Sequence, residues 1–201
     1  MDMPRNKQQT MNRLLVAASE TIVAHGVGQI NSTAVATQAG INKNLVYRYF
    51  RGWNGLLEAL FAQLLSEVNL VTDTRPATGR IDALVAQETY LFAFSQLIST
   101  NPAFWVLLRW QVDHSETVLA QSLTKLLNES MEEVAGSDAA DVDMLRLLIA
   151  GVTCLAPVQS NVHESTKRVI RHLFGQLRSA RQISEIMSVP NDTYSETVFA
   201  H

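Results

Sequence analysis

Residues 30–50, which read INSTAVATQAGINKNLVYRYF, constrain the fold of this chain more than any other segment. Residues 32–39 are small and tolerate a helix, and Gly40 follows them. Because glycine adopts a positive φ at little cost, it is typical of a helix C-terminus. Asn42 can then accept hydrogen bonds from the free N–H groups of a second helix over residues 43–49. The segment therefore predicts two short helices joined by a tight turn.

The second of these helices is predicted to present polar and aromatic side chains outward. Val46 and Phe50 recur at the i, i+4 spacing of a buried helical side. The side chains left to point elsewhere are Lys43, Asn44, Tyr47, Arg48 and Tyr49. A helix, a glycine turn and a second helix of this kind form the helix-turn-helix pattern, whose second helix fits the major groove of DNA.

Three runs of residues carry a more specific signal: Ala39-Gly40-Ile41-Asn42-Lys43, Val46-Tyr47-Arg48-Tyr49-Phe50 and Leu56-Leu57. Together with Leu14, Ala17, Ala18, Gly26 and Ile30, they resemble the DNA-binding signature of the tetracycline-repressor (TetR) family. The resemblance covers about residues 10–60, and the rest of the chain agrees with the family only in length and helical layout.

The resemblance implies a set of DNA-binding residues. It assigns Lys43, Tyr47 and Tyr49 mainly to phosphates, and Ser32 or Thr33 to the neighbourhood of the DNA backbone. The residues expected to supply sequence preference are Asn44, Leu45 and Arg48. Arg5, Lys7 and Arg13 on the first helix could brace the phosphate backbone, or they could be ordinary solvated charges.

Three positions depart from the family pattern. A glycine is usual at Asn44, a small polar residue at Leu45, and a phosphate-contacting lysine at Trp53. Leu45 could contact a thymine methyl group, but it cannot hydrogen-bond to a base edge. Trp53 cannot neutralise a phosphate, and a packing role suits it better. The docking mode is therefore expected to carry over with fewer contacts.

The charge distribution agrees with a DNA-binding segment at the N-terminus. The net charge of the 201 residues is −3. Residues 1–60 nevertheless contain six basic and three acidic residues, whereas residues 61–201 contain ten basic and sixteen acidic ones. A basic N-terminal part on an acidic remainder is typical of a DNA-binding module joined to another domain.

The remaining chain predicts further helices and no convincing strand. The expected helices cover residues 6–25, 53–71, 80–99, 102 onward, 115–135, 141–159 and 163–187, with a polar linker at 72–79. Apolar residues occur nearly all round the helix at 80–99, which implies burial on several sides. With the helix-turn-helix, we expect an all-α fold of about nine helices.

The last two predicted helices are each apolar on one side. In the family that the chain resembles, this pair forms a four-helix bundle with its copy in a second subunit. Two recognition helices held roughly 34 Å apart would also read a palindrome across one turn of DNA. The predicted interface residues are Leu148, Val152, Ile170, Leu173, Phe174 and Leu177. The alternative is that these apolar sides only pack on their own chain.

Six aromatic residues lie between positions 90 and 110. They could form core, line an apolar ligand pocket or stack on bases, although the acidic surroundings disfavour stacking. Family analogy favours a pocket. The predicted ligand-binding residues are Glu88, Tyr90, Phe92, Phe94, Trp105, Trp110, Gln111, His114 and Thr153. Glu88 could instead face solvent or pair with Arg109; if buried, its carboxylate needs a partner.

Other classes of protein and site are disfavoured. No phosphate loop, nucleophile elbow, HExxH or CxxC motif occurs, so we expect neither an enzyme nor a cofactor or metal site. Cys154 is the only cysteine, which excludes an internal disulfide. No apolar run approaches the roughly 18 residues of a membrane span, and the N-terminus lacks a secretion signal. We expect a cytoplasmic protein.

Together these observations predict a two-part regulator. Residues 1–52, here called the head, would bind double-stranded DNA, and residues 53–201, here called the body, would dimerise and bind a largely apolar effector. The predicted function is a ligand-responsive repressor that binds a palindromic operator as a homodimer. The rival prediction is a helical protein that binds small molecules or partners and carries a degenerate DNA-binding head.

Overall fold

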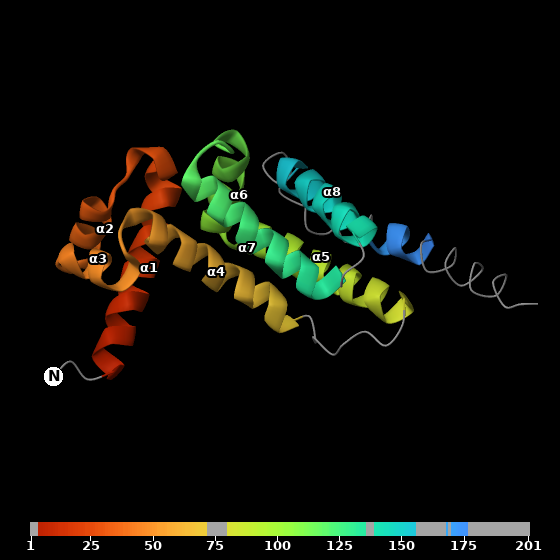
Figure 1. The fold of residues 1–201 in the computed structure, drawn as a ribbon, viewed down its shortest axis with the longest axis horizontal. Helices are drawn as coiled ribbons and strands as arrows, with labels where there is room; N and C mark the ends of the chain where they lie inside the picture. Colours follow the sequence, from red (N-terminus) through yellow and green to blue (C-terminus); the bar gives the residue numbers. More distant parts are fainter. Residues whose placement is uncertain (1–3, 72–79, 136–138, 156–167, 169, 177–201) are drawn as a thin grey trace, which may run out of the picture.

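The computed structural model of the protein describes residues 4–71, 80–135, 139–155, 168 and 170–176. All regular structure in these ranges is helical, which confirms the predicted all-α fold. The helices divide between the two ends of an elongated molecule, with the head at one end and the body at the other (Figure 1). The predicted linker at 72–79 lies outside the described residues.

The head consists of three α-helices and one short 3-10 helix. They are α1 (Pro4–His25), η1 (Val27–Gln29), α2 (Ser32–Ala39) and α3 (Asn44–Phe50). The apolar side of α1 is buried as its helical spacing predicts, with Leu14, Ala18 and Ile22 fully inaccessible to solvent. The 3-10 helix was not predicted, and it follows Gly26, whose φ of 78° ends α1.

The body contains five α-helices in the described ranges. They are α4 (Trp53–Val71), α5 (Arg80–Thr100), α6 (Pro102–Asp113), α7 (Val118–Ala135) and α8 (Ala139–Leu155). Residues 168 and 170–176 are also helical and lie at the far end of the body. The rest of the helix predicted at 163–187 lies outside the described residues, as do positions 156–159 of the preceding one.

The helix predicted to begin at Ser115 in fact begins at Val118. His114 is the C-cap of α6, and its carbonyl accepts the backbone N–H of Thr117 in a tight turn. The Thr117 hydroxyl oxygen then accepts the N–H of Ala120 at 3.2 Å, so threonine caps the new helix. Periodicity alone extended the helix across this turn, because it does not register caps.

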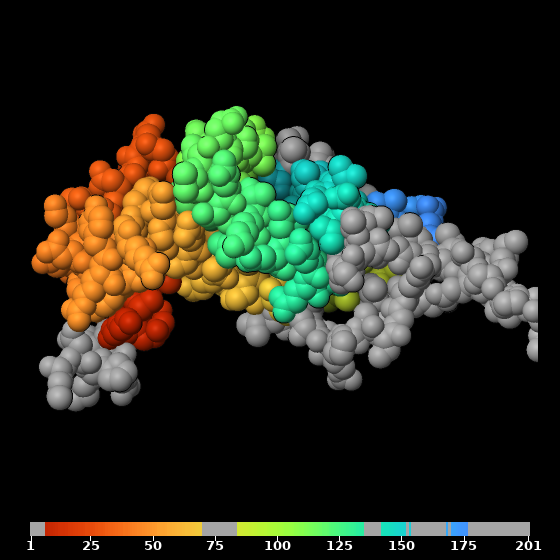
Figure 2. Space-filling model, viewed as in Figure 1, coloured from red at the N-terminus to blue at the C-terminus, as the bar shows by residue number. Residues whose placement is uncertain are grey.

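Helix α4 joins the head to the body. It packs against α1 and α3 at one end and against α5, α6 and α7 along its length. Figure 2 shows α7 covering part of α4 in the middle of the molecule. The buried apolar residues form one continuous core from Leu14 in α1 to Phe174 beyond α8. The head and the body are therefore not separated by a polar gap.

Helix α5 packs against α4, α6, α7 and α8, and it is not buried on every side. Tyr90, Leu91 and Phe94 are inaccessible to solvent, whereas Val85 is 47% exposed. No single helix in the described ranges is long and apolar enough to cross a membrane; only Leu84–Thr100 and Pro102–Asp113 taken together, bent by 104°, reach that length and composition.

Candidate nucleic-acid interface and body cavity

The turn between α2 and α3 is built by local hydrogen bonds. Asn31 Oδ1 accepts the N–H groups of Thr33 and Ala34 and so caps the start of α2. Gly40 ends that helix in the left-handed conformation, with φ of 63°. Asn42 Oδ1 then accepts the N–H of Asn44 at 2.9 Å. Asn42 therefore bonds to the start of α3, but the N-cap of this helix is Lys43 rather than the predicted Asn42, and α3 runs from Asn44 to Phe50.

A cation from α1 reinforces this turn. The Arg13 guanidinium donates from Nη2 to the carbonyl of Ala39 at 2.6 Å. That carbonyl belongs to the last residue of α2, where a positive charge is favourable. Arg13 thereby supports the turn from within the head, a contact that the sequence pattern did not predict.

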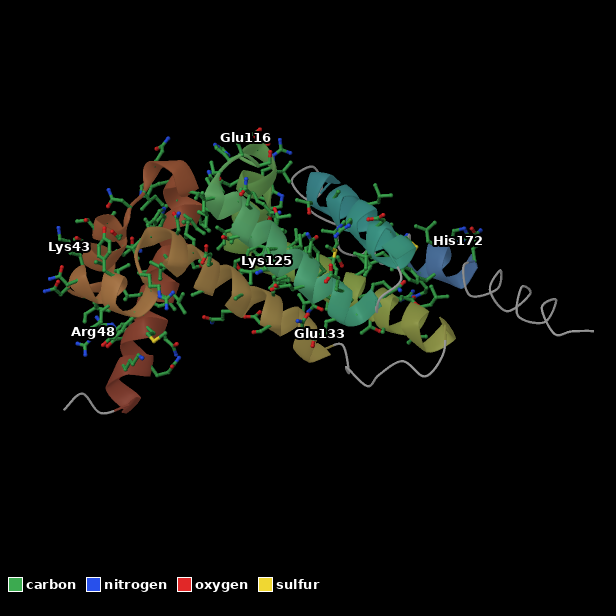
Figure 3. The ribbon with its side chains drawn as sticks, in the orientation of Figure 1. Lys43, Arg48, Glu116, Lys125, Glu133 and His172 are labelled. Atoms are coloured by element: carbon green, nitrogen blue, oxygen red, sulfur yellow. The ribbon has the colours of Figure 1, made fainter. Side chains whose placement is uncertain are left out.

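Helix α3 exposes most of the predicted DNA-binding residues on one surface. Lys43, Asn44, Tyr47 and Arg48 are exposed, and Leu45 is half-buried. Figure 3 places Lys43 and Arg48 at the end of the molecule opposite the body. Thr33 is also exposed, at the first turn of α2. The surface defined by these residues is available to a large partner such as a duplex.

Two tyrosines on α3 are positioned by their neighbours. The Tyr47 hydroxyl lies 3.4 Å from the hydroxyl of Ser32, which is itself only 5% exposed. Ser32 therefore supports Tyr47 in this structure. The half-buried ring of Tyr49 lies 5.7 Å from Lys7 Nζ and 5.9 Å from the Arg48 guanidinium carbon, so cations from two helices contact one ring.

The junction of α3 and α4 depends on a glycine that sequence reasoning missed. A β-carbon placed on Gly55 would lie 1.8 Å from the carbonyl oxygen of Phe50, far inside contact distance. The only available signal was an isolated glycine inside a helical pattern, which can mark close backbone approach. Trp53 is half-buried and packs against the core beside this junction, so it serves the packing role preferred for it.

The body contains a cavity of about 300 Å³ between α6, α7 and α8. Of the nine predicted ligand-binding residues, Gln111 and Thr153 line it. The lining also includes Asn128, together with Arg109 and Arg146, two arginines that were not predicted as ligand residues. Arginines at helical positions resemble ordinary surface charges in a sequence, so no pattern distinguished them.

None of the predicted aromatic ligand residues lines this cavity: Tyr90 and Phe94 are buried in the core, and Phe92, Trp105 and Trp110 pack against it. The rings of Tyr90 and Phe94 are 6.0 Å apart, and Phe94 contacts Phe104 edge-on at 5.2 Å. The Tyr90 hydroxyl is 2.8 Å from the Ser130 hydroxyl. Burial raises the pKa of Tyr90 to about 12, because the desolvated phenolate is disfavoured; the Ser130 hydrogen bond opposes this rise and the Glu133 charge adds to it.

The other predicted residues do not line the cavity. Trp105 Nε1 donates to the carbonyl of Thr153 at 3.3 Å, which links α6 to α8. Trp110 stacks on His114 with ring centroids 4.8 Å apart. Arg109 pairs with Asp113 at 3.0 Å rather than with Glu88. Glu88 is half-buried. The ring of Phe92 lies 6.0 Å from the guanidinium carbon of Arg171.

The predicted dimer residues divide into buried and exposed ones. Ile170 and Phe174 are 3% and 0% exposed, so they pack within their own chain, as the alternative reading required. Leu173 is 37% exposed and Leu148 is half-buried. Leu147, which was not predicted, is 75% exposed on α8. Positions 152 and 177 have no described side chains.

Within the described ranges, no group of three or more histidine, cysteine, aspartate or glutamate side chains could hold a metal ion.

Comparison with known proteins agrees with this geometry. Residues 14–60 match the sequence model of the bacterial regulatory proteins of the tetR family. An uncharacterised HTH-type transcriptional regulator of Mycobacterium tuberculosis is 24% identical over 159 residues, which are 76% of this chain and 84% of the relative. The matched head segment confirms the resemblance read from the sequence.

Two solved structures share the fold over most of their length. The fatty acid degradation regulator FadR from Bacillus halodurans has a TM-score of 0.61 at 17% identity, over 89% of this chain and 98% of that one. The regulator FadR from Bacillus subtilis, in complex with stearoyl-CoA, has a TM-score of 0.60 at 17% identity, over 79% and 96% of the two chains. At these identities the likeness concerns the fold.

Proposed function

Because the chain belongs to the TetR family of DNA-binding transcriptional regulators, we propose that it is a ligand-responsive repressor that binds a palindromic operator as a homodimer in the cytoplasm. In this proposal residues 1–52 bind DNA, and residues 53–201 dimerise and bind the effector. The observation that carries the proposal is the position of α6. This helix packs against α1 and η1 of the head, and it also supplies Leu108 and Gln111 to the cavity wall.

Because α6 contacts both the cavity and the head, a movement of this helix would couple the two. A ligand that displaces α6 would displace α1, and with it the turn that Arg13 ties to Ala39. Such a ligand releases DNA only if it binds the DNA-incompetent state more tightly than the competent one. A hundredfold release requires about 2.7 kcal/mol of coupling free energy.

The proposed dimer uses the end of the body that lies away from the head. Leu147 on α8 and Leu173 on the helical segment at 170–176 are exposed. A second copy that covers these leucines would leave both recognition helices free. Two heads spaced by one turn of DNA would then contact both halves of a palindrome.

The recognition residues are proposed to divide by chemistry. Lys43, Tyr47 and Tyr49 hold phosphates, and Arg48 and Asn44 hydrogen-bond to base edges, with Leu45 against a thymine methyl. The half-buried Leu45 and the packed Trp53 keep a second function open: a helical effector-binding protein whose head has lost sequence preference.

The decisive experiment is selection of bound sequences from a random duplex library, followed by affinity for the winner at two salt concentrations. We expect an enriched palindrome and a steep loss of affinity with salt, because phosphate contacts release counterions. Absence of any motif, with weak uniform binding, would favour the second function.

A matched pair of substitutions tests the assignment of Arg48. Arg48→Ala should weaken operator binding by about 1–3 kcal/mol and relax preference at one position. Lys125→Ala removes the same charge from α7 in the body (Figure 3) and should leave operator choice unchanged. Equal affinity of Arg48→Ala and the parent for the selected operator would refute the assignment.

A further inference from the structure

The ring of Tyr49 is anchored on the core of the head, while part of it stays accessible to solvent. Tyr49 is the penultimate residue of α3 and is half-buried. Its ring packs against the buried apolar core, to which α3 contributes Val46 and Phe50. A ring that is anchored in this way presents its π face at a defined position, and such a face attracts cations.

Two cations from different helices lie over this ring. Lys7 Nζ on α1 is 5.7 Å from the ring centroid, and the Arg48 guanidinium carbon on α3 is 5.9 Å from it. Both distances are within the roughly 6 Å over which an aromatic ring holds a cation. Lys7 and Arg48 are both exposed, and Figure 3 places Arg48 on the side of the head from which α1 starts. The start of α1 and the recognition helix therefore share one cationic cluster.

The charges around this cluster favour an anionic partner. Glu20 is the only acidic residue among residues 4–52. It follows Lys7 in α1 at a distance of about 20 Å along the helix axis, at 1.5 Å per residue, and it accepts a hydrogen bond from the Gln38 amide. Two like charges beside one ring repel each other. A polyanion such as DNA relieves that repulsion when its phosphates replace the counterions.

The two cations of the cluster suit different parts of a duplex. The guanidinium of Arg48 presents its donors in a planar fork, which can bond to O6 and N7 of a guanine together. The ammonium of Lys7 is a compact point charge, which suits a phosphate. Arg48 is on the helix expected to enter the major groove, whereas Lys7 is on α1. A base contact for Arg48 and a backbone contact for Lys7 follow from this placement.

A second cation of α1 has a different contact. Arg13 Nη2 donates to the carbonyl of Ala39 at 2.6 Å and so supports the turn between α2 and α3. Among the described residues, the contact that Lys7 makes is with the Tyr49 ring. Of these two cations, Lys7 is therefore the one placed beside the recognition helix, where a phosphate can reach it.

We propose that the Tyr49 ring positions two DNA contacts at once: Arg48 at a base edge in the major groove, and Lys7 at a phosphate beside that groove. Tyr49 is then a positioning residue through its ring, in addition to the phosphate contact proposed for its hydroxyl. The inference rests on the proposed DNA-binding function. It adds the start of α1 to the DNA-binding surface and specifies how Arg48 is held there.

Two substitutions of Tyr49 in the full-length protein separate the ring from the hydroxyl. Affinity is measured for the selected operator and for duplexes changed at the base pair whose preference Arg48→Ala relaxes. Tyr49→Phe keeps the ring, so it should weaken all duplexes alike and retain the preference of the parent. Tyr49→Leu removes the π face and should relax that preference by roughly two- to fivefold per half-site. A parent-like preference in Tyr49→Leu, or equal relaxation in Tyr49→Phe, overturns the proposal.

Salt dependence tests the phosphate contact of Lys7. Lys7→Gln should weaken all duplexes alike. It should also make the plot of log affinity against log salt less steep by about 0.9 per phosphate contact, or about 1.8 for the two copies in a dimer. Lys125→Gln is the matched control, because it removes an exposed lysine from α7 in the body, and it should leave the slope unchanged. An unchanged slope in Lys7→Gln overturns the proposal.

A double-mutant cycle tests whether Lys7 depends on the ring. Tyr49 also packs against the core, so a loss of affinity in Tyr49→Leu alone does not separate positioning from stability. Lys7→Gln should cost less affinity in the Tyr49→Leu background than in the parent, because the ring no longer holds Lys7 there. Equal costs in both backgrounds overturn the inference and leave the DNA-binding function intact, provided that the parent enriches a palindrome. If the parent enriches no motif, the proposed function fails, and the inference fails with it.

Discussion

The head and the body differ in how they treat buried polar groups. In the head, the buried Thr21 hydroxyl bonds to the Ala17 carbonyl and lies 2.8 Å from Gln38 Oε1. In the body, both amide atoms of Gln87, the indole nitrogen of Trp110 and Gln111 Oε1 are buried without partners. Within the described ranges, these four are the only buried side-chain nitrogen or oxygen atoms without a hydrogen-bond partner, and all of them belong to α5 or α6.

This difference agrees with the tasks proposed for the two regions. A surface that fits a duplex must hold one shape, and fully paired polar groups favour a single arrangement. An unpaired buried group costs about 1–3 kcal/mol. The contrast predicts that substitutions in the head lower the free energy of unfolding, whereas removal of the unpaired buried polar groups of the body raises it.

The largest expected effect is at the joint between the two regions. Gly55→Ala should lower the free energy of unfolding by about 3 kcal/mol or more, because the new β-carbon would collide with the Phe50 carbonyl. Urea denaturation measures the loss. Gly151→Ala on α8 is the control: its β-carbon meets nothing within 4 Å, and it should stabilise the helix by about 0.5–1 kcal/mol. Equal urea midpoints for the two variants would contradict the packing argument.

The second effect has the opposite sign and sits in the body. Gln87→Met should raise the free energy of unfolding by about 2 kcal/mol, since it removes two unpaired buried polar atoms at similar volume. Thermal unfolding in the absence of any ligand measures the gain. A decrease in stability would mean that Gln87 has partners in solution, and the contrast between head and body would then weaken.

A smaller effect compares one helix cap from each region. Asn31→Ala and Asn101→Ala should each lower the free energy of unfolding by about 1 kcal/mol, because each side chain caps a helix start. Only Asn31→Ala should also weaken operator binding, since α2 supports α3. Measured affinities for the selected duplex separate the two. Equal losses of DNA affinity would show that a cap in the body affects the DNA-binding surface as strongly as a cap in the head.

The smallest effect concerns pH and the core of the body. Because the pKa of Tyr90 is raised to about 12, an unfolded tyrosine ionises near pH 10 while the folded one stays neutral. The stability that Tyr90 contributes is therefore complete below pH 10 and is lost between pH 10 and about 12. At pH 10.5 the loss should be below about 1 kcal/mol.

Urea midpoints compared with those of Tyr90→Phe isolate this contribution. In that variant the Ser130 hydroxyl loses Tyr90 but still donates to Asn69 Oδ1, so it is not left without a hydrogen-bond partner. The difference between the two proteins should shift steadily as the pH rises above 10. A difference that stays constant with pH would show that Tyr90 ionises as readily in the folded state as in the unfolded one.

A structural feature could be predicted from the sequence where the residues that determine it lie close together in the chain. The bounds of α2 agreed with the sequence because Asn31 and Gly40 act within a few residues of the helix that they delimit. The side-chain pattern of α1 was equally local. Gly55 was missed because its constraint comes from a carbonyl in the preceding helix, and a sequence does not record how closely two helices approach.

The cavity shows the same limit more strongly. Its wall combines residues from α6, α7 and α8 that are up to 45 positions apart, from Leu108 to Thr153. Which faces converge depends on helix crossing angles, and these are set by packing rather than by periodicity. Gln111 was predicted because a polar residue stood among apolar ones, but its unmatched oxygen became visible only with the position of Thr124.

The continuous apolar core has a consequence for cooperativity. Helix α4 buries Leu57 and Leu64 in the same cluster that contains Leu14 and Phe174. Unfolding of either region would therefore expose apolar side chains of the other region to water. The chain should therefore unfold on heating in a single transition. A ligand bound in the body should raise the unfolding temperature of the head as well. Promoter occupancy and protein lifetime would then respond to the same small molecule.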